Sequence, residues 1–397
     1  MAKFNFDELT QRKDSYSKRW DREFVEERFG PLPDDYISLW IADLDYRLAP
    51  VMTAKFQELL DKNTFAYTYV YDEFYDAVLN WMNNKVKFNL KKEHITYNNG
   101  TVTAMYNCIK AFCDPGDKVI INNPVYNPFR DAVIKNGAEL VENSLHIGED
   151  FRYYIDFAEL EEMIKEHRPK VYIFCSPHNP GGRVWTQSEI DKVCELCRCY
   201  DVLLLVDEVH SDHIRKGNFI SFLDSQVDIH NKLIVINSPN KPFNIAGLQS
   251  TYSLIPDSTI NEKFRNQLDK SHIVEPNVFG IAGICAAYTE EGKEWLDECY
   301  AYILDNYEWA RDYIANNIPQ FKNMDIEATY LMWVDVTGTG MNGDDFTFKL
   351  AKETGVLVQE GGSFGDEGSN FIRINLGTSR ANIEEAFKRI KAFVDSL

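Results

Sequence analysis

The sequence has no long hydrophobic run. Apolar stretches such as 202–206 extend over about five residues, whereas a membrane-spanning helix needs ~20. The first thirty residues carry charged side chains throughout and contain no apolar signal segment. We therefore expect no membrane partner and a cytoplasmic location.

Basic side chains are also scarce. The 42 lysines and arginines stand against 62 aspartates and glutamates, which gives a net charge of −20. A surface of this sign repels nucleic-acid phosphates, and no basic stripe along the sequence offsets it. We therefore expect no nucleic-acid partner.

Cysteine is sparse, with 8 among 397 residues. Several cysteines lie within apolar or helical stretches, which argues against a disulfide framework. Cys194, Cys197 and Cys199 lack a second cysteine or histidine pair at zinc-ligand spacing. The run 207–213 contains acidic and histidine side chains that could also bind a metal ion. At the end of a strand, however, neighbouring side chains point to opposite faces, so only some of them could meet at one ion. We expect no metal site, and metal binding at either group is the weaker alternative.

From about residue 95 to 285, short apolar runs alternate with amphipathic helical patterns. The runs at 118–121, 171–175, 202–206 and 233–236 are apolar on both faces. This pattern predicts an α/β fold with a mostly parallel sheet between helices. A helical stretch at 290–318 then leads to a smaller α+β unit. We predict a large domain of residues 48–288 and a discontinuous small domain of residues 1–47 and 289–397.

Polar side chains follow these apolar runs, at the sheet edge where open α/β sheets bind ligands. Tyr126, Asn179, Asp207 and Lys241 each follow one run, and the turn 99–101 precedes a helical stretch whose first amides form an anion site. A lysine can form a Schiff base with an aldehyde, an acid can hold a proton on a pyridine nitrogen, and an aromatic ring can stack on the pyridine. The set predicts pyridoxal 5′-phosphate as the cofactor.

Each of these residues also has a simpler explanation when taken alone. A loop lysine is usually a solvated charge, and an aspartate after a strand often caps a helix. An asparagine between prolines commonly holds its turn, and a tyrosine commonly packs in a core. The joint placement at successive strand ends favours a cofactor site.

The segment 338–343 matches the G-x-G-x-x-G pattern of dinucleotide-binding loops. Asp344 and Asp345 follow it where the next helical stretch begins, and two carboxylates there would repel a pyrophosphate. We interpret the segment as a surface turn with capping acids.

Four motifs resemble those of fold-type I pyridoxal-phosphate enzymes in the aminotransferase class I/II superfamily. They are SPHNPGGRVW at 176–185, DEVH at 207–210, SPNKPFN at 238–244 and FIRIN at 371–375. The SPHNP loop and WIADLDY at 40–46 are similar to the MalY/PatB branch of cystathionine β-lyases, or C–S lyases. The resemblance covers nearly the whole chain.

The resemblance implies roles for individual residues. Lys241 would hold the cofactor, Asp207 would pair with the ring nitrogen and Tyr126 would stack on the ring, these three being the catalytic set. Cofactor-binding positions would further include Gly100, Thr101 and Ser238 at the phosphate, Asn179 at the ring hydroxyl oxygen, and His210. Arg373, with Asn179, would bind the substrate α-carboxylate. Tyr67 would reach the phosphate of a neighbouring subunit, which implies a homodimer with shared active sites.

Some positions depart from the broader superfamily. Gln249 stands where many aminotransferases carry a phosphate-binding arginine, and His210 stands where they carry a tyrosine. The Asn-Asn-Gly-Thr turn at 98–101 differs from the Pro-Gly-Val that the lyase branch usually shows.

The activity that the resemblance implies is α,β-elimination on cystathionine or a related S-substituted cysteine, with release of a thiol, pyruvate and ammonia. One alternative is an aminotransferase acting on an L-amino acid, because that reaction uses the same lysine, ring and carboxylate contact. A remoter alternative is a non-catalytic regulatory member of the fold. Intact Lys241, Asp207 and Arg373 disfavour this last alternative.

Overall fold

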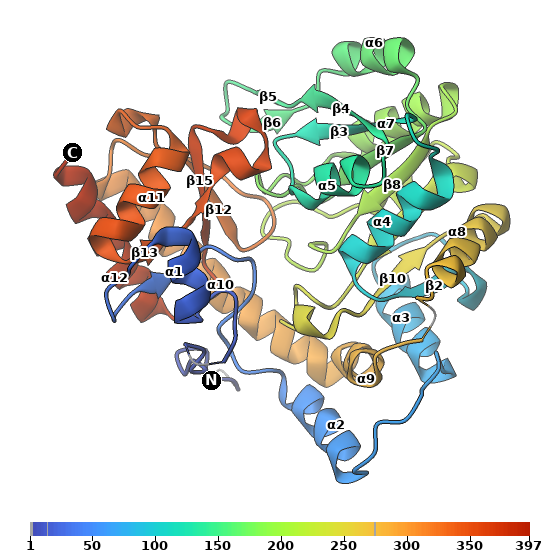
Figure 1. The fold of residues 1–397 in the computed structure, drawn as a ribbon, viewed down its shortest axis with the longest axis horizontal. Coiled ribbons are helices and arrows are strands. Elements are labelled where there is room, and N and C mark those ends of the chain that lie inside the picture. The colour runs from blue at the N-terminus through green and yellow to red at the C-terminus, as the bar shows by residue number, and fades with distance from the viewer. Residues whose placement is uncertain (1–2, 14, 274) are drawn as a thin grey trace.

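The chain folds around two β-sheets. The computed structural model describes residues 3–13, 15–273 and 275–397, and within them the larger sheet has seven strands and the next has four. Figure 1 shows the larger sheet on the right among helices and the smaller one on the left, with α10 passing along the molecule between them. The two parts meet where Arg373 of the smaller sheet donates a hydrogen bond to Asn179, which follows a strand of the larger sheet.

The seven-stranded sheet has the order β2-β10-β9-β8-β7-β3-β4. Its strands are β2 Ile95–Asn98, β3 Lys118–Asn123, β4 Glu139–Ser144, β7 Val171–Cys175, β8 Leu203–Asp207, β9 Leu233–Asn237 and β10 Thr251–Leu254. The run from β4 to β9 is parallel, and β10 is antiparallel to both of its neighbours. The predicted fold, with a mostly parallel sheet between helices, is confirmed.

Both faces of this sheet are buried, which explains the continuous apolar runs. Along β7, Tyr172 and Phe174 enter one hydrophobic core, whereas Val171 and Ile173 enter a second core on the opposite face. The surrounding helices are α2 Pro50–Asp61, α3 Asp72–Asn83, α4 Thr101–Phe112, α5 Pro128–Ile134, α6 Phe157–His167, α7 Gln187–Cys199, α8 Ser258–Lys270 and α9 Val278–Ala287. A short hairpin is formed by β5 His146–Ile147 and β6 Tyr153–Tyr154.

The second part begins with the long helix α10, Glu290–Asn317. Its sheet has the order β11-β12-β15-β14, with β11 Lys322–Met324, β12 Leu331–Asp335, β14 Gln359–Glu360 and β15 Phe371–Asn375. The accompanying helices are α1 Arg22–Phe29, α11 Gly343–Thr354 and α12 Arg380–Asp395. Strand β1, Ile37–Ser38, pairs in parallel with β13, Val356–Leu357, so the N-terminal segment packs on the C-terminal part. The division into domains of residues 48–288 and of 1–47 with 289–397 stays a proposal.

The glycine-rich segment 338–343 lies between β12 and α11. Asn342 is the cap of α11, and its side chain accepts a hydrogen bond from the Asp345 amide at 2.7 Å. Asp344 accepts from the Gly362 amide at 3.0 Å. The expectation that acids cap this helix is therefore wrong in detail, because the cap is an asparagine.

In the part of the chain that the structure describes, no helix is both long and apolar enough to span a membrane.

Candidate active site

One cavity lies at the carboxyl ends of β3, β7, β8 and β9. The sequence-predicted residues that line it are Gly100, Thr101, Tyr126, Asn179, Asp207, His210 and Lys241. They come from separate segments, and the parallel strand order β9-β8-β7-β3 brings those segments side by side. The sheet topology therefore assembles most of the predicted site.

Asp207 is the last residue of β8, and its side chain is buried at the edge of the cavity. The Val209 amide donates to its Oδ1 at 3.1 Å. Burial raises the pKa of Asp207 to about 6, while the Val209 hydrogen bond and the nearby Lys241 charge act in the opposite direction. The carboxylate is thus ionised near neutral pH and can pair with a cationic ring nitrogen.

Lys241 lies in the turn that follows β9. Its Nζ donates to the Ala42 carbonyl oxygen at 2.9 Å, so the amine is held against the segment that precedes α2. Burial is the main cause that lowers the pKa of Lys241 to about 8, and the charge of Arg373 lowers it further. A substantial fraction of this amine is neutral just above neutral pH, which a nucleophile or general base requires.

Arg373 lies on β15 of the second sheet and is only 4% exposed. Its Nη1 donates to Asn179 Oδ1 and its Nη2 donates to the Trp40 carbonyl oxygen, both at 3.1 Å. The Nε is buried and has no hydrogen-bond partner among the described residues. Burial lowers the pKa of Arg373 to about 10, so the guanidinium stays charged at neutral pH. A buried cation with an unpaired N–H suits an anionic ligand.

The sequence analysis assigned no role to His178, although this residue stands inside the SPHNP motif. Its ring is buried, with Nε2 2.9 Å from the Pro124 carbonyl oxygen and Nδ1 accepting from the Gly181 amide at 3.2 Å. Burial lowers the pKa of His178 to about 3, so the ring is neutral and Nε2 carries the hydrogen. His178 thereby ties the loop of Asn179 to the segment that carries Tyr126.

A strap of residues 326–329 connects β11 to β12 and passes beside the same loop. The amides of Glu327 and Ala328 donate to the Gly182 carbonyl oxygen at 2.7 and 3.0 Å. Gly182 has a φ of +65°, and a Cβ there would lie 2.6 Å from the Cβ of Ile326. The close approach requires glycine, and it sets the position of the Asn179 loop relative to the sheet that carries Arg373.

His210 lines the cavity and is 3% exposed. Its Nδ1 is buried without a hydrogen-bond partner in the described part of the chain. Burial lowers the pKa of His210 well below its usual range, and the Lys241 charge adds to this effect. The ring is therefore neutral and can accept or donate one hydrogen bond to a ligand.

Gly100 marks the cavity wall where α4 begins. Its φ is +97°, and a Cβ at this position would lie 2.6 Å from Gln249 Oε1. Because Gly100 has no side chain, the backbone itself forms this part of the cavity wall. No side chain accepts a hydrogen bond from the first amides of α4. Free amides at a helix N-terminus favour an anion such as a phosphate.

Two predicted cofactor-binding residues lie outside this cavity lining. Ser238 is fully buried, and its hydroxyl donates to the Ser250 carbonyl oxygen at 3.2 Å and accepts from the Asn240 amide at 2.9 Å. Tyr67 is 93% exposed and lies on the segment between α2 and α3. Neither residue is among those that line the cavity.

The donors present fit a phosphate-bearing pyridine aldehyde. The cavity combines an amine, a buried carboxylate, an aromatic side chain, and bare backbone at a helix start. Buried Nδ1 of His210 and Oδ1 of Asn240 have no described partners, which leaves polar atoms for a ligand to satisfy. This chemistry matches pyridoxal 5′-phosphate.

Comparisons with known proteins identify the family of this chain. The family model for aminotransferase class I and II matches residues 34–390. Cystathionine beta-lyase PatB of Bacillus subtilis is 36% identical over 392 residues, covering 98% of this chain and 99% of that protein.

Solved structures are similar over the same length. Cystalysin from Treponema denticola, which contains pyridoxal 5′-phosphate, has a TM-score of 0.94 at 30% identity and covers 99% of both chains. A pyridoxal-phosphate-bound C–S lyase from Staphylococcus hominis, in complex with L-cycloserine, has a TM-score of 0.91 at 30% identity and covers 98% of both chains.

Proposed function

Because the chain belongs to the aminotransferase class I and II family, we propose that it is a pyridoxal 5′-phosphate-dependent C–S lyase acting on cystathionine or a related S-substituted L-cysteine. One observation carries this proposal. Lys241 and Asp207 line one buried cavity, and Arg373 is hydrogen-bonded to Asn179 in the wall of that cavity. Three distant segments thus supply the amine, the acid and the cation that such a reaction needs.

Several residues would hold the cofactor. The amides at Gly100 and Thr101 would bind its phosphate, and Tyr126 would stack on its ring. Asp207 would keep a proton on the ring nitrogen. Asn179, whose Oδ1 is engaged by Arg373, still has its Nδ2 to donate to the ring hydroxyl oxygen. When bound, the cofactor supplies an aldehyde that captures an amino group and a ring that accepts the electron pair released at the substrate α-carbon.

Arg373 positions the substrate. Its buried guanidinium would bind the α-carboxylate through two parallel hydrogen bonds, for which the planar fork is suited. Because the surrounding structure already fixes this side chain through Trp40 and Asn179, little side-chain freedom is lost on binding. The α-carbon is thereby oriented toward Lys241.

Lys241 acts as the general base. Its neutral amine takes the proton from the substrate α-carbon, which its lowered pKa allows near physiological pH. The bond between the β-carbon and sulfur then breaks, and its electron pair leaves with sulfur as a thiolate. Protonation gives the thiol, and hydrolysis of the three-carbon remainder gives pyruvate and ammonia.

An aminotransferase remains the second candidate, because Lys241, Asp207 and Arg373 serve both reactions. Incubation of the holoenzyme with cystathionine and without a keto acid separates the two. We expect continuous release of pyruvate and homocysteine in a coupled dehydrogenase assay. Turnover that appears only when a keto acid is added would instead identify transamination. Bound cofactor without turnover on any amino acid would support a regulatory protein.

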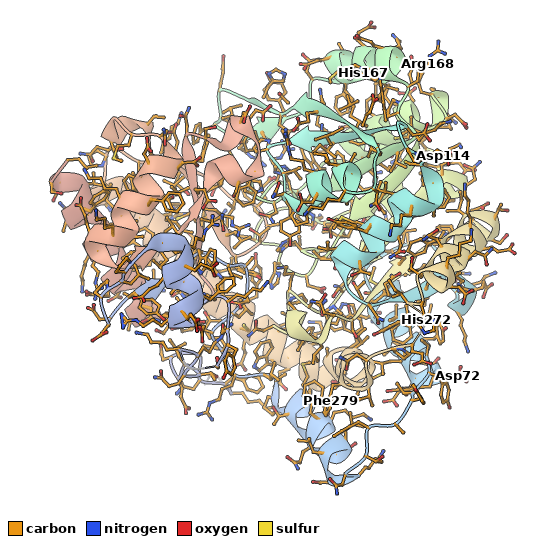
Figure 2. The ribbon with its side chains drawn as sticks, viewed as in Figure 1. Asp72, Asp114, His167, Arg168, His272 and Phe279 are labelled. Carbon is orange, nitrogen blue, oxygen red and sulfur yellow. The ribbon has the colours of Figure 1, made fainter. Side chains whose placement is uncertain are left out.

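We also infer a homodimer with shared active sites. Between α2 and α3, the side chains of Phe65, Tyr67 and Tyr69 are 55%, 93% and 73% exposed. Phe65 packs on Phe279 of α9 with ring centroids 5.3 Å apart, and Figure 2 shows Phe279 beside α2 at the molecular periphery. Such a cluster of exposed aromatic side chains is typical of a protein interface. Tyr67 would reach the phosphate in the second subunit.

Mixing two variants tests this arrangement. Tyr67→Ala and Lys241→Ala should each be impaired, but a hybrid dimer would contain one site with both native residues. Because about half of randomly assorted dimers are hybrids, recovery should approach roughly a quarter of wild-type activity. Hybrid dimers that form, as shown by tagged subunits, without any recovery would contradict the shared site. The cytoplasmic location stays a prediction.

A further inference from the structure

The side chain of Asn244 joins the turn that carries Lys241 to the segment 40–44. Its Oδ1 accepts a hydrogen bond from the Leu44 amide at 2.9 Å, and its Nδ2 donates to the Leu44 carbonyl oxygen at 2.7 Å. We propose that this two-point contact, hereafter the Asn244 clamp, makes Asn244 a positioning residue that sets where the free amine of Lys241 lies relative to Arg373. The inference rests on the proposed function and deepens it, because it names a residue outside the cavity lining on which the general base depends.

Asn244 and Lys241 belong to one compact turn. The Ile245 amide donates to the Asn240 carbonyl oxygen at 3.1 Å, and this bond closes the turn around both residues. Between them, Phe243 is fully buried. The backbone of Asn244 is left-handed with a φ of +57°, a conformation that asparagine adopts more readily than most residues. A contact made by the Asn244 side chain therefore also fixes the backbone of Lys241.

The segment 40–44 provides backbone acceptors for both cations of the proposed site. The Trp40 carbonyl oxygen accepts from Arg373 Nη2 at 3.1 Å, and the Ala42 carbonyl oxygen accepts from Lys241 Nζ at 2.9 Å. These two acceptors are only two residues apart. The position of this short segment therefore determines how the amine lies relative to the guanidinium that would bind the substrate carboxylate.

Other contacts hold the same segment from sides that do not involve the turn of Lys241. Asn375 of β15 donates to the Asp43 carbonyl oxygen at 2.7 Å, and Arg12 donates to the Leu44 carbonyl oxygen at 2.9 Å. In the described part of the chain, the turn and the segment share only the hydrogen bonds of the clamp and the bond made by the Lys241 amine itself. The clamp is thus the connection that persists when the amine moves.

The clamp matters most while the Lys241 amine is free. The amine becomes free when the substrate amino group bonds to the aldehyde carbon and the bond from that carbon to the lysine nitrogen breaks. The Ala42 carbonyl, which also accepts from the Tyr330 hydroxyl at 3.0 Å, is then the acceptor that holds the amine for proton transfer. Because a misplacement of about 1 Å can lower a rate by about 10²-fold, loss of the clamp should act on this step.

Asn244→Gly removes the clamp and keeps a residue that tolerates the left-handed backbone. We expect kcat to fall by about 10- to 100-fold in the pyruvate assay with cystathionine, and KM to stay within about threefold of wild type. The Kd of the apoenzyme for pyridoxal 5′-phosphate, measured from the visible absorbance, should also stay within about threefold, because the covalent link positions the amine in that state. A general loss of structure would change all three quantities.

Asn244→Asp is a second variant of nearly the same shape. Its carboxylate can accept from the Leu44 amide but cannot donate to the Leu44 carbonyl oxygen, so kcat should again fall without a matching change in KM. Asn261→Asp is the matched control, because Asn261 accepts from Thr96 Oγ1 at 2.6 Å and donates to the Glu93 carbonyl oxygen at 2.9 Å outside the cavity. We expect this control to keep the wild-type kcat, whatever its melting temperature.

Hydrogen–deuterium exchange of the apoenzyme tests the clamp without turnover. In Asn244→Gly, the Leu44 amide should exchange about five- to tenfold faster than in wild type, as for the loss of one hydrogen bond. In Asn261→Asp, the same amide should exchange at the wild-type rate. Unchanged exchange in Asn244→Gly would show that the clamp does not hold the segment, and would overturn the inference.

The remaining outcomes separate this inference from the proposed function. Faster exchange with a wild-type kcat would remove the positioning role and leave the proposed reaction intact. A Kd for pyridoxal 5′-phosphate that weakens in proportion to the loss of kcat would also overturn the inference, because Asn244 would then support cofactor binding. If the wild-type apoenzyme shows no visible band with pyridoxal 5′-phosphate, the proposed function fails and the positioning role fails with it.

Discussion

Replacing Lys241 by alanine abolishes the visible absorbance of the lysine-linked cofactor and lowers kcat by about 10⁴-fold, the upper range for loss of a general base. The physical reason is that one amine has two tasks, holding the aldehyde and accepting the proton from the α-carbon. The cavity lining contains no second amine among the described residues. The absorbance spectrum of the purified variant and a pyruvate assay measure the two effects separately.

Lys85→Gln is the matched control for this variant. Lys85 is partly buried, and desolvation lowers the pKa of its amine to about 7, but this amine contacts Asp212 and lies outside the cavity lining. We expect this control to keep the visible band. Borohydride reduction followed by peptide mass analysis locates the linked lysine. A yellow Lys241→Ala protein, or a label on Lys85, would refute the assignment.

Replacing Arg373 by glutamine should lower kcat/KM by about 10²- to 10³-fold, within the range for truncating one partner of a buried charge pair. The loss follows because the substrate carboxylate would enter a buried site without its cation. Arg373→Lys should retain more of the wild-type kcat/KM than Arg373→Gln but less than the full value, since an ammonium group keeps the charge but not the planar pair of donors. Steady-state kinetics with an S-substituted cysteine measure the effect, which we expect mainly in KM.

A substrate analogue that lacks the carboxylate controls for indirect damage. An S-substituted cysteamine should bind equally weakly to wild type and to Arg373→Gln, because neither can use the carboxylate contact. Arg265→Gln controls for the loss of a hydrogen-bonded arginine elsewhere in the protein, since Arg265 is exposed and donates to Thr96 Oγ1 and to the Ile95 carbonyl oxygen outside the cavity. An unchanged KM in Arg373→Gln would remove Arg373 from substrate binding.

The predicted strands agree closely with the structure where burial on both faces enforces a continuous apolar run. The runs at 118–121, 171–175 and 233–236 lie within β3, β7 and β9, and the run at 202–206 overlaps β8. β8 extends to Asp207, so the acid is the last residue of the strand and not the first of the loop. The apolar periodicity could not locate the end of β8, because a polar residue ends the apolar pattern whether or not the backbone hydrogen bonds to the neighbouring strands continue.

The sequence predicted those cavity residues that belong to a motif at the end of a strand. It could not predict the residues whose position depends on contacts between segments that are distant in sequence. Tyr126, Asn179 and Lys241 follow β3, β7 and β9, and all three line the cavity. Asn240 precedes the lysine in the sequence, but only the structure shows that its Oδ1 is buried without a hydrogen-bond partner among the described residues. Ser238 was expected at the phosphate, whereas its hydroxyl is engaged by Ser250 and the Asn240 amide. Its predicted role stays a prediction.

By itself the sequence determined the class of fold and the family and predicted Lys241 as the reactive amine, because apolar periodicity and contiguous motifs are local properties of the chain. Only the tertiary structure decided which oxygen atoms accept hydrogen bonds from Lys241 and Arg373, how far burial shifts their pKa values, and which buried polar atoms of the described residues have no partner. These depend on groups far apart in sequence: Ala42 accepts from an amine 199 positions away, and Asn179 accepts from a guanidinium 194 positions away. Desolvation and hydrogen bonding act through space, so their effects appear only once the chain has folded.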